Sequence, residues 1–467
     1  MHQQIQQTDA LANHQTGILR NKSAVHKIGP VVRITLFALA TGLLVAGVHF
    51  PKTVGLFLFI TGFFNYLILI AFRLSNNVGQ LARSAPKQAP FDPEYWPSFT
   101  IIVPLKREGE VVHGTLRAIA SLDYPDVLKQ VIVVVEETDT MTLSALRDAD
   151  LPSNFERLLI PEQLPFTKGR ALLHALRSAR GEYVTVYDAE SRPEPQQLRQ
   201  AARVLAMPGG PWCLQASIRI SNQSTNWITR NFASEYYEWY ERHLRELSDQ
   251  EMPFGLGGNS FFISRALLEE ASAWDPYNVT EDADLAVRLI EKQVRLRLLD
   301  SVTTETCPER MTDWTNQRTR WNKGLFVTQL VHLPRSVAIR QFGFAGWLNF
   351  WLPMACSSLV PFFNTFVPVY LICGGFSFQW LFVLSGSLWL MFLINVVCST
   401  LINKLTYKRL GIRASYATAF FDVLAYLVLH LGAGFKAYAE YFWSPLHWHK
   451  TAHKEAQTTK ESVLNIP

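Results

Sequence analysis

The 467-residue sequence has few cysteines and few charged residues. Its cysteines are Cys213, Cys307, Cys356, Cys373 and Cys398. None belongs to a CxxC pair and their number is odd, so we expect neither a zinc site nor a disulfide framework, as in a reducing compartment. Charged residues make up 18% of the chain, the net charge is +5, and no Lys/Arg run resembles a nucleic-acid-binding arm. Nucleic acid is therefore excluded as an expected partner.

Hydrophobic residues make up 48% of the chain and gather in two blocks on either side of a middle region. The polar, Gln-rich lead over residues 1–30 is too long for a secretory signal, and we expect it to be a disordered cytoplasmic tail. Val31–Phe50 and Val54–Phe72 are each close to the ~20 residues that cross a bilayer. Together they predict a transmembrane hairpin over residues 31–73.

Basic residues flank this hairpin on one side of the membrane. They are Arg20, Lys22, Lys27 and Arg33 before it and Arg73 and Arg83 after it, with only Lys52 in the turn. The positive-inside rule places the tail and the middle region in the cytoplasm.

The second apolar block, residues 346–443, predicts three or four further spans. Trp347–Phe376 contains three prolines and fits either one kinked span or two short ones. Trp380–Ile402 is one span and Tyr416–Leu431 begins another. The total is five or six spans, followed by a cytoplasmic tail over residues 444–467.

Two ionisable residues, Asp422 and Lys436, lie within or near the last predicted span. A charged residue inside a membrane is by default a candidate functional group. It can also lie at the interface with its side chain extended toward water, and the sequence leaves both interpretations open.

The middle region alternates β-branched apolar runs with amphipathic stretches, which predicts an α/β domain with a doubly wound, mostly parallel sheet. The expected strands are Phe99–Pro104, Gln130–Val135, Phe155–Ile160 and Tyr183–Tyr187, and the expected helices Val111–Leu122, Thr142–Asp148 and Gly169–Arg180. Ligands bind beyond the carboxyl ends of such strands. Acidic residues fall at two of these ends. Turns after strands often contain acidic residues, which would explain one such end but explains two in the same sheet less well.

The acidic strand ends suggest a nucleotide site. Glu136 and Glu137 would accept hydrogen bonds from a base or ribose. Asp188 and Glu190, two residues apart, lie on one face of an extended strand end and are suited to Mg²⁺ or Mn²⁺ bridging a diphosphate. Lys168 and Arg170 open a helix and would support the phosphates, although a solvated helix face explains them equally well.

The run Thr280-Glu281-Asp282-Ala283-Asp284 precedes a predicted helix, Leu285–Lys292. The helix dipole alone favours acidic residues there, but three carboxylates exceed what capping requires. Crowded carboxylates raise one another's pKa toward the range of a useful base. We assign Asp282 as the candidate general base, with Glu281 beside it.

The run Gln317-Arg318-Thr319-Arg320-Trp321 lies on an amphipathic segment, Pro308–Leu333. At helical spacing Gln317, Arg320 and Trp321 share one face. Arg320 can pair with a diphosphate and Trp321 can stack on a sugar ring. An interfacial membrane helix explains the same pattern, so this segment alone does not distinguish a sugar-nucleotide site from such a helix.

Taken in order, these motifs resemble the membrane-integrated family-2 glycosyltransferases, which include cellulose, hyaluronan and chitin synthases. The strand-end acids, Asp188-Ala189-Glu190, Thr280-Glu281-Asp282 and Gln317–Trp321 carry the resemblance. The run Val186–Pro195 looks especially like a bacterial polysaccharide synthase subgroup.

The resemblance implies a GT-A domain over residues 92–306, amphipathic interface helices over 307–345, and transmembrane helices on both sides. It implies an inverting hexosyltransferase in the bacterial inner membrane, with a nucleotide-sugar donor, a divalent metal held by Asp188 and Glu190, and export or regulatory subunits as further partners. Together with the residue analysis above, this gives as expected donor-binding residues Glu136, Glu137, Lys168, Arg170, Asp188, Gln317 and Arg320. The implied acceptor-binding residues are Trp321, Gly258, Asn259 and Gln215.

The sequence departs from the family pattern where Glu replaces the usual Asp at positions 136, 137 and 190, which shifts the ligand atoms by one methylene. Three hypotheses follow. The first is a processive polysaccharide synthase, and the second is a single-addition enzyme acting on a membrane lipid. The third is a non-catalytic membrane component that keeps the fold.

Overall fold

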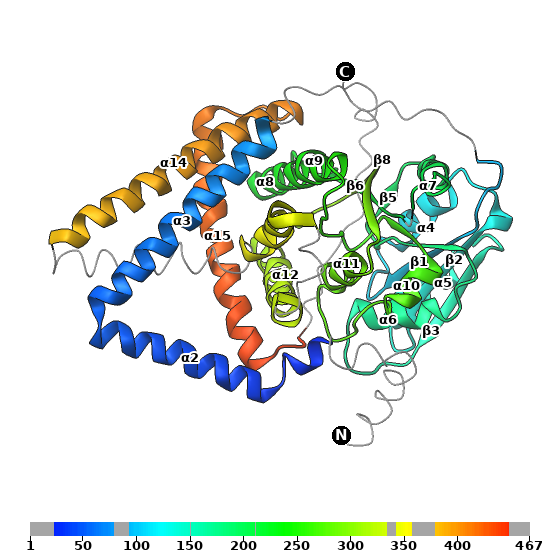
Figure 1. Cartoon of the computed structure of the whole chain (residues 1–467). Coiled ribbons are helices and arrows are strands. Elements are labelled where there is room, and N and C mark those ends of the chain that lie inside the picture. The colour runs from blue at the N-terminus through cyan, green and yellow to red at the C-terminus, as the bar shows by residue number, and fades with distance from the viewer. Residues whose placement is uncertain are drawn as a thin grey trace.

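The computed structural model describes residues 23–78, 93–149, 151–210, 212–333, 342–356 and 379–447. Figure 1 shows an α/β domain on one side of these residues and a group of long helices on the other. The α/β domain is therefore as predicted, and long helices precede and follow it in the chain.

One mixed sheet of eight strands forms the centre of the α/β domain, in the order β3-β2-β1-β4-β7-β6-β8-β5. The strands are β1 Phe99–Leu105, β2 Lys129–Glu136, β3 Phe155–Ile160, β4 Tyr183–Val186, β5 Arg192–Pro193, β6 Trp212–Ile220, β7 Phe261–Ser264 and β8 Arg295–Glu305. The first four are parallel to one another, as predicted. β7 runs antiparallel between β4 and β6, and β6 pairs in parallel with β8.

Helices cover both faces of the sheet, which explains the continuous apolar strands. They include α4 Val112–Ala120, α5 Thr140–Arg147, α6 Lys168–Leu176, α7 Gln197–Leu205, α10 Arg265–Glu270 and α11 Glu281–Glu291. Because side chains alternate along a strand, Ile102 and Val134 pack with α6 and α11 on one face. Ile101 and Val133 pack with α4 and α7 on the other face.

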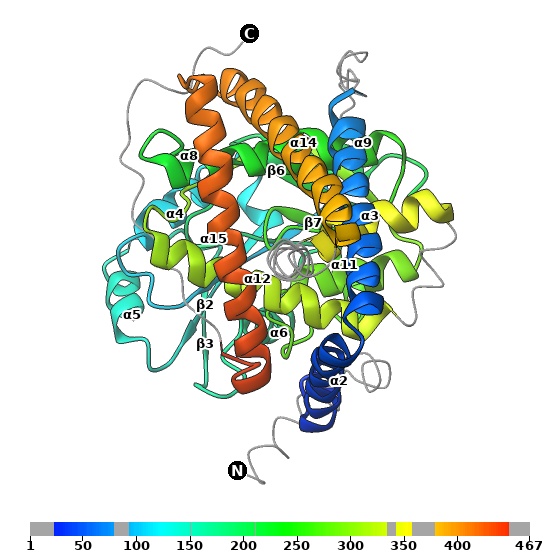
Figure 2. The same ribbon diagram turned by 90° about the vertical axis from the view of Figure 1, so that its left-hand side faces the viewer.

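Four described helices contain a stretch that is long and apolar enough to cross a membrane. They are α2 Pro30–His49, α3 Pro51–Val78, α14 Gln379–Arg409 and α15 Tyr416–Trp443. In Figure 2, α3, α14 and α15 lie against one another across one face of the α/β domain. The predicted span Trp347–Phe376 is helical over residues 343–356, and its remainder lies outside the described residues.

The first two membrane helices are joined at a single non-helical residue, Phe50. Proline begins each of them, at Pro30 and Pro51, where its fixed φ and missing N–H are best tolerated. Figure 1 shows α2 and α3 diverging from this joint as an open V.

The expected disordered tail over residues 1–30 ends earlier than predicted. Residues 1–22 lie outside the described residues, but Ser23 caps a short 3₁₀ helix, Ala24–His26, that packs on the α/β domain. The order comes from contacts with residues about 250 positions away, which local composition does not reveal.

The helix α12 Met311–His332 carries the Gln317–Trp321 run and lies between the sheet and the membrane helices, beside α8 Trp227–Tyr236 (Figure 1). Its polar residues are buried together with its apolar ones, Lys323 and Thr319 among them. It therefore differs from the expected amphipathic surface helix, because its polar side chains bind neighbouring elements rather than water.

The two charged residues of the last span both pair with protein groups. Arg230 of α8 donates from two nitrogens to the Asp422 carboxylate at 2.8 and 2.9 Å, and the Tyr407 hydroxyl donates to it at 2.9 Å. Lys436 Nζ donates to Asn316 Oδ1 of α12 at 2.6 Å. Asp422 therefore fastens α15 to α8 and α14, and Lys436 fastens it to α12, which carries the Gln317–Trp321 run.

We expect Asp422→Asn to lower the free energy of unfolding by about 3 kcal/mol, because it leaves the Arg230 guanidinium without its counter-charge. Thermal unfolding of the detergent-purified protein measures the loss. Glu269→Gln is the control, because it breaks an exposed pair with Arg265 and should cost below about 1 kcal/mol. Equal shifts for the two variants would contradict a structural role for the Asp422 pair.

Candidate active site

A cavity of about 730 Å³ opens at the carboxyl ends of β1 and β4 and continues to α14 and α15, two of the candidate membrane helices. This volume is in the usual range for small-molecule sites. Eleven of the predicted site residues line it, namely Glu136, Lys168, Asp188, Glu190, Gly258, Asn259, Glu281, Asp282, Gln317, Arg320 and Trp321. Residues more than a hundred positions apart thus share one pocket.

Lys168 is the central cation of the acidic end of this cavity. Its Nζ forms an ion pair with Asp188 and donates to the Gly258 carbonyl at 2.7 Å. Thr167 caps the helix that begins at Lys168. Burial alone would lower the pKa of Lys168, but Asp188 and Glu281 raise it above its ordinary value. The ammonium therefore stays charged among the acids.

Glu305, at the end of β8, is a site residue that the sequence did not predict. It accepts hydrogen bonds from Asn259 Nδ2 at 2.8 Å and Ser191 Oγ at 2.7 Å. Burial, then Glu190 and Asp188, raise the pKa of Glu305 to about 8. The pattern that predicted Glu136 and Asp188, an acidic residue at the end of a strand, could have identified Glu305 as well.

The acidic end of the cavity has the chemistry of a divalent-cation site. Burial, then the neighbouring Asp188, raise the pKa of Glu190 to about 7 although Lys168 and Arg320 lower it. Among the described residues no three acidic, His or Cys side chains are grouped closely enough to hold an ion alone. Mg²⁺ is commonly bound by one or two carboxylates together with substrate phosphates. Asp188 and Glu190 fit that mode.

The candidate base lies at the first turn of α11. The Asp282 Oδ1 accepts a hydrogen bond from Ala283 N at 2.9 Å. Burial raises the pKa of Asp282, and burial together with Asp282 raises the pKa of Glu281 to about 7. A Cβ on Gly258 would lie 3.3 Å from Asp282 Oδ2, so glycine lets this loop approach the base closely.

The third carboxylate of the same run, Asp284, points away from the cavity. It is fully buried and accepts from Arg288 Nη2 at 2.7 Å, and His332 Nε2 lies 2.7 Å from its other oxygen. Burial would raise the pKa of Asp284, but Arg288 and His332 hold it below its ordinary value. Asp284 therefore joins α11 to α12, and only Glu281 and Asp282 serve the cavity.

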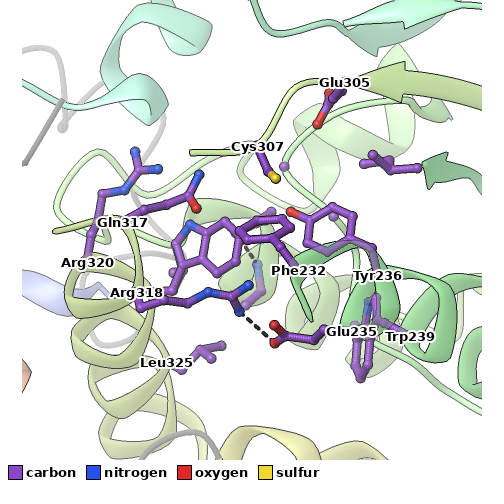
Figure 3. A pocket seen from close by; sticks show the side chains of 18 of the residues that line it. Phe232, Glu235, Tyr236, Trp239, Glu305, Cys307, Gln317, Arg318, Arg320 and Leu325 are labelled. Carbon is purple, nitrogen blue, oxygen red and sulfur yellow. Dashed lines mark hydrogen bonds and ion pairs between the residues drawn. The ribbon is translucent and has the colours of Figure 1, made fainter. Parts of the chain in front are cut away.

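Helix α12 supplies the opposite wall of the cavity, with Gln317 and Arg320 pointing from it (Figure 3). The Gln317 Oε1 is buried and has no hydrogen-bond partner among the described residues. A buried acceptor without a donor is costly, which suits a ligand hydroxyl at that point. Arg320 lies near enough to Glu281 and Asp188 to interact with both charges.

Arg318 is a second residue that the sequence left without a role. Its guanidinium lies 4.5 Å from the ring centre of Trp321 and forms a 2.6 Å ion pair with Glu235 (Figure 3). The Tyr426 hydroxyl of α15 donates to the other Glu235 oxygen at 2.8 Å. Trp321 also stacks on Tyr236, with ring centres 6.5 Å apart. This aromatic wall is therefore tied to a membrane helix.

Three predicted site residues do not line the cavity. Glu137 is exposed outside it. Arg170 pairs with Glu136 at 2.9 Å and donates to a backbone carbonyl, so its charge is used inside the fold. Gln215 accepts from Gly257 N at 2.8 Å and donates to the Asn259 carbonyl at 3.0 Å. It holds the loop from behind, which corrects its assignment as an acceptor-binding residue.

Comparison with known proteins agrees with this geometry. Residues 97–324 match the family model described as "Glycosyltransferase like family 2". The chain is 23% identical over 375 residues to "Probable glycosyltransferase YdaM" of Bacillus subtilis (strain 168), covering 76% of this chain and 86% of that protein. It is 26% identical over 266 residues to "Beta-monoglucosyldiacylglycerol synthase" of Synechocystis sp. (strain ATCC 27184 / PCC 6803 / Kazusa), covering 54% of each.

A third relative is "Probable glucomannan 4-beta-mannosyltransferase 15" of Arabidopsis thaliana, 26% identical over 204 residues, which cover 42% of this chain and 37% of that protein. The chain thus spans about half or less of the length of the second and third relatives. Among solved structures, the mannosyltransferase PcManGT from Pyrobaculum calidifontis, determined with GDP-Man and Mn²⁺, aligns with a TM-score of 0.53 at 21% identity. That alignment covers 83% of this chain and 98% of the other. Residues 97–324 therefore match the model of family-2 glycosyltransferase domains and have a GT-A-like fold, and among the described residues four helices are long and apolar enough to span a membrane.

Proposed function

We propose that this protein transfers a hexose, with inversion, from a nucleotide-sugar donor to a growing polysaccharide at the cytoplasmic face of the bacterial inner membrane. One observation carries the proposal. A single cavity contains Asp188, Asp282 and Trp321 and reaches helices α14 and α15. The groups proposed to bind phosphate, take the proton and stack on the sugar thus share one cavity with two candidate membrane helices, which supports the proposal.

The chain's own residues divide the work of transfer. Lys168 and Arg320 bind the donor diphosphate, and Asp188 and Glu190 would hold a divalent ion beside it. When bound, that ion would neutralise charge on the departing nucleotide. Asp282 accepts the proton of the acceptor hydroxyl as it attacks the anomeric carbon from the face opposite the leaving group.

The acceptor enters from the membrane side of the cavity. Asn395, Ser399 and Asn403 lie four residues apart along α14, so they form a polar stripe on one helix face, and all three line the cavity. The Asn395 Oδ1 is buried without a hydrogen-bond partner among the described residues. Polar groups inside a membrane helix fit the hydroxyls of a sugar chain better than acyl chains.

A membrane lipid is the second candidate acceptor. Leu69, Val396 and Leu427 give the same region of the cavity apolar walls. One relative is named as a synthase of a glucosyldiacylglycerol. Incubating membranes with radiolabelled nucleotide sugars and extracting with organic solvent separates the candidates. Long water-phase products support the polysaccharide, and single-sugar organic-phase products support the lipid.

A panel of nucleotide sugars tests the proposed activity directly. Membranes that contain the protein should release free nucleotide from at least one donor, above the rate of membranes without it. No release with any donor would favour the non-catalytic hypothesis.

We expect chelation of divalent ions to abolish this release. Asp188 and Glu190 would then face the donor diphosphate without a counter-ion, and the charges would repel. Adding Mg²⁺ or Mn²⁺ back should restore the activity, whereas Ca²⁺, which prefers more ligands and longer bonds, should restore less. Full activity in chelator would show that the two carboxylates do not hold a required ion.

A further inference from the structure

The segment before the first membrane helix is bound to the catalytic domain. Ser23 Oγ donates to Asp275 Oδ1 at 3.1 Å, and Ala24 N donates to Asp275 Oδ2 at 2.6 Å. We call Ser23, Ala24, Lys27 and Ile28 the N-terminal clasp. It joins residues about 250 positions apart in the chain.

Asp275 begins the loop that leads into the catalytic acids. It is fully buried, and the remaining described hydrogen bond to its carboxylate comes from Tyr277 N at 3.0 Å within the loop itself. The loop, residues 275–280, runs directly into Glu281 and Asp282 at the start of α11. Without the clasp, the buried carboxylate would lose two donors, which is costly in a desolvated position.

The same loop also contacts both cationic walls of the cavity. Thr167 Oγ1, next to Lys168, donates to the Pro276 carbonyl at 2.7 Å. Asn278 Nδ2 donates to Thr328 Oγ1 of α12 at 2.8 Å. Movement of this loop would therefore change how the base faces both Lys168 and the α12 residues.

Apolar packing completes the clasp. Ala24 and Ile28 pack with Val327 of α12 and Tyr441 of α15 in one buried cluster. The Tyr441 hydroxyl donates to the Lys27 carbonyl at 2.7 Å. The clasp thus contacts the catalytic loop, the α12 helix and a membrane helix at once, and it continues directly into α2.

We propose that the N-terminal clasp positions the general base. By holding Asp275, it sets the path of the 275–280 loop and so the place of the Asp282 carboxylate relative to Lys168 and Gly258. This role rests on the proposed function, since it requires Asp282 to act in transfer. It also links the placement of the first membrane helix to the catalytic loop.

Full-length variants test the clasp. Ala24→Pro removes one N–H donor, and it suits the backbone because Ser23 is extended, as residues before proline are. We expect kcat to fall about 10- to 100-fold, since misplacement by about 1 Å can cost that much, while the donor KM changes less than about twofold.

Ser23→Ala should show a smaller loss of the same kind, and Ser23→Thr, which keeps the hydroxyl, should retain activity. Val25→Ala, an exposed side chain beside the clasp, is the matched control.

Hydrogen–deuterium exchange gives a second readout that does not depend on activity. Amides of residues 276–283 should exchange faster in Ala24→Pro than in the wild type or Val25→Ala. If Ala24→Pro speeds exchange but leaves kcat unchanged, the clasp is only a structural contact and the proposal is wrong. Unchanged exchange in Ala24→Pro would also overturn the proposal. A wild-type protein that releases no nucleotide from any donor overturns the proposed function instead, while exchange still reports whether the clasp holds the loop.

Discussion

Asp282→Asn should lower turnover by about 10²–10⁴-fold, the usual contribution of a general base, while the protein remains folded. The variant keeps the Oδ1 that accepts from Ala283 N, so the first turn of α11 retains its hydrogen bond. It loses only the capacity to take a proton. Nucleotide release from membranes measures the effect, and thermal unfolding confirms the fold.

The pH dependence of kcat/KM tests whether Asp282 acts as a base. Asp282 acts as its carboxylate, so the rate should fall as pH is lowered through its pKa. Burial raises that pKa, so the fall should begin above the ordinary aspartate range near about 4. The residual activity of Asp282→Asn should lack this acid limb. Glu137→Gln, an exposed strand-end acid outside the cavity, is the control and should leave rate and profile unchanged.

An unchanged rate in Asp282→Asn would transfer the base role to Glu281, whose pKa of about 7 also suits proton transfer. Glu281→Gln would then show the loss and the missing acid limb. Loss in neither variant would remove proton abstraction by this run from the mechanism.

Most of the parallel half of the sheet was predictable because β1, β2 and β4 are apolar runs buried on both faces. The edge strand β3 is only partly buried and contains Glu156 and Arg157, yet all four predicted strands match the observed ones closely. The antiparallel insertion of β7 between β4 and β6 was not predictable. It is decided by pairing between distant segments, and local periodicity carries no information about partners.

The residues of the candidate site also divide into those that local sequence predicts and those that the pairing of distant segments places. Asp188, Asp282 and Trp321 belong to short motifs, and the cavity brings them together as the resemblance implied. Glu305 belongs to none, and it reaches the site because β8 pairs with β6. Gln215 and Arg170 show the reverse error. A motif position indicates proximity to a site, but hydrogen bonding decides whether the side chain faces the ligand or the fold.

Lys168 and Arg170 provide a sharp comparison, because the sequence assigned both to the donor phosphates. Lys168→Met keeps the length of the side chain but removes the charge that pairs with Asp188 in the cavity. We expect kcat/KM to fall about 10²–10³-fold, as when one preorganised electrostatic group is removed from an active site. Steady-state kinetics with varied donor concentration measures the loss.

Arg170→Met should behave in the opposite way. It breaks the buried pair with Glu136, so it should lower the thermal midpoint, while Lys106 still pairs with Glu136 at 3.0 Å from the other side. The kcat per folded molecule should stay close to that of the wild type, because Arg170 does not line the cavity. A comparable loss of turnover in both variants would mean that the Arg170 charge reaches the donor. Two cations two residues apart on α6 would thus be separated into a phosphate-binding group and a structural one by the neighbours that each contacts.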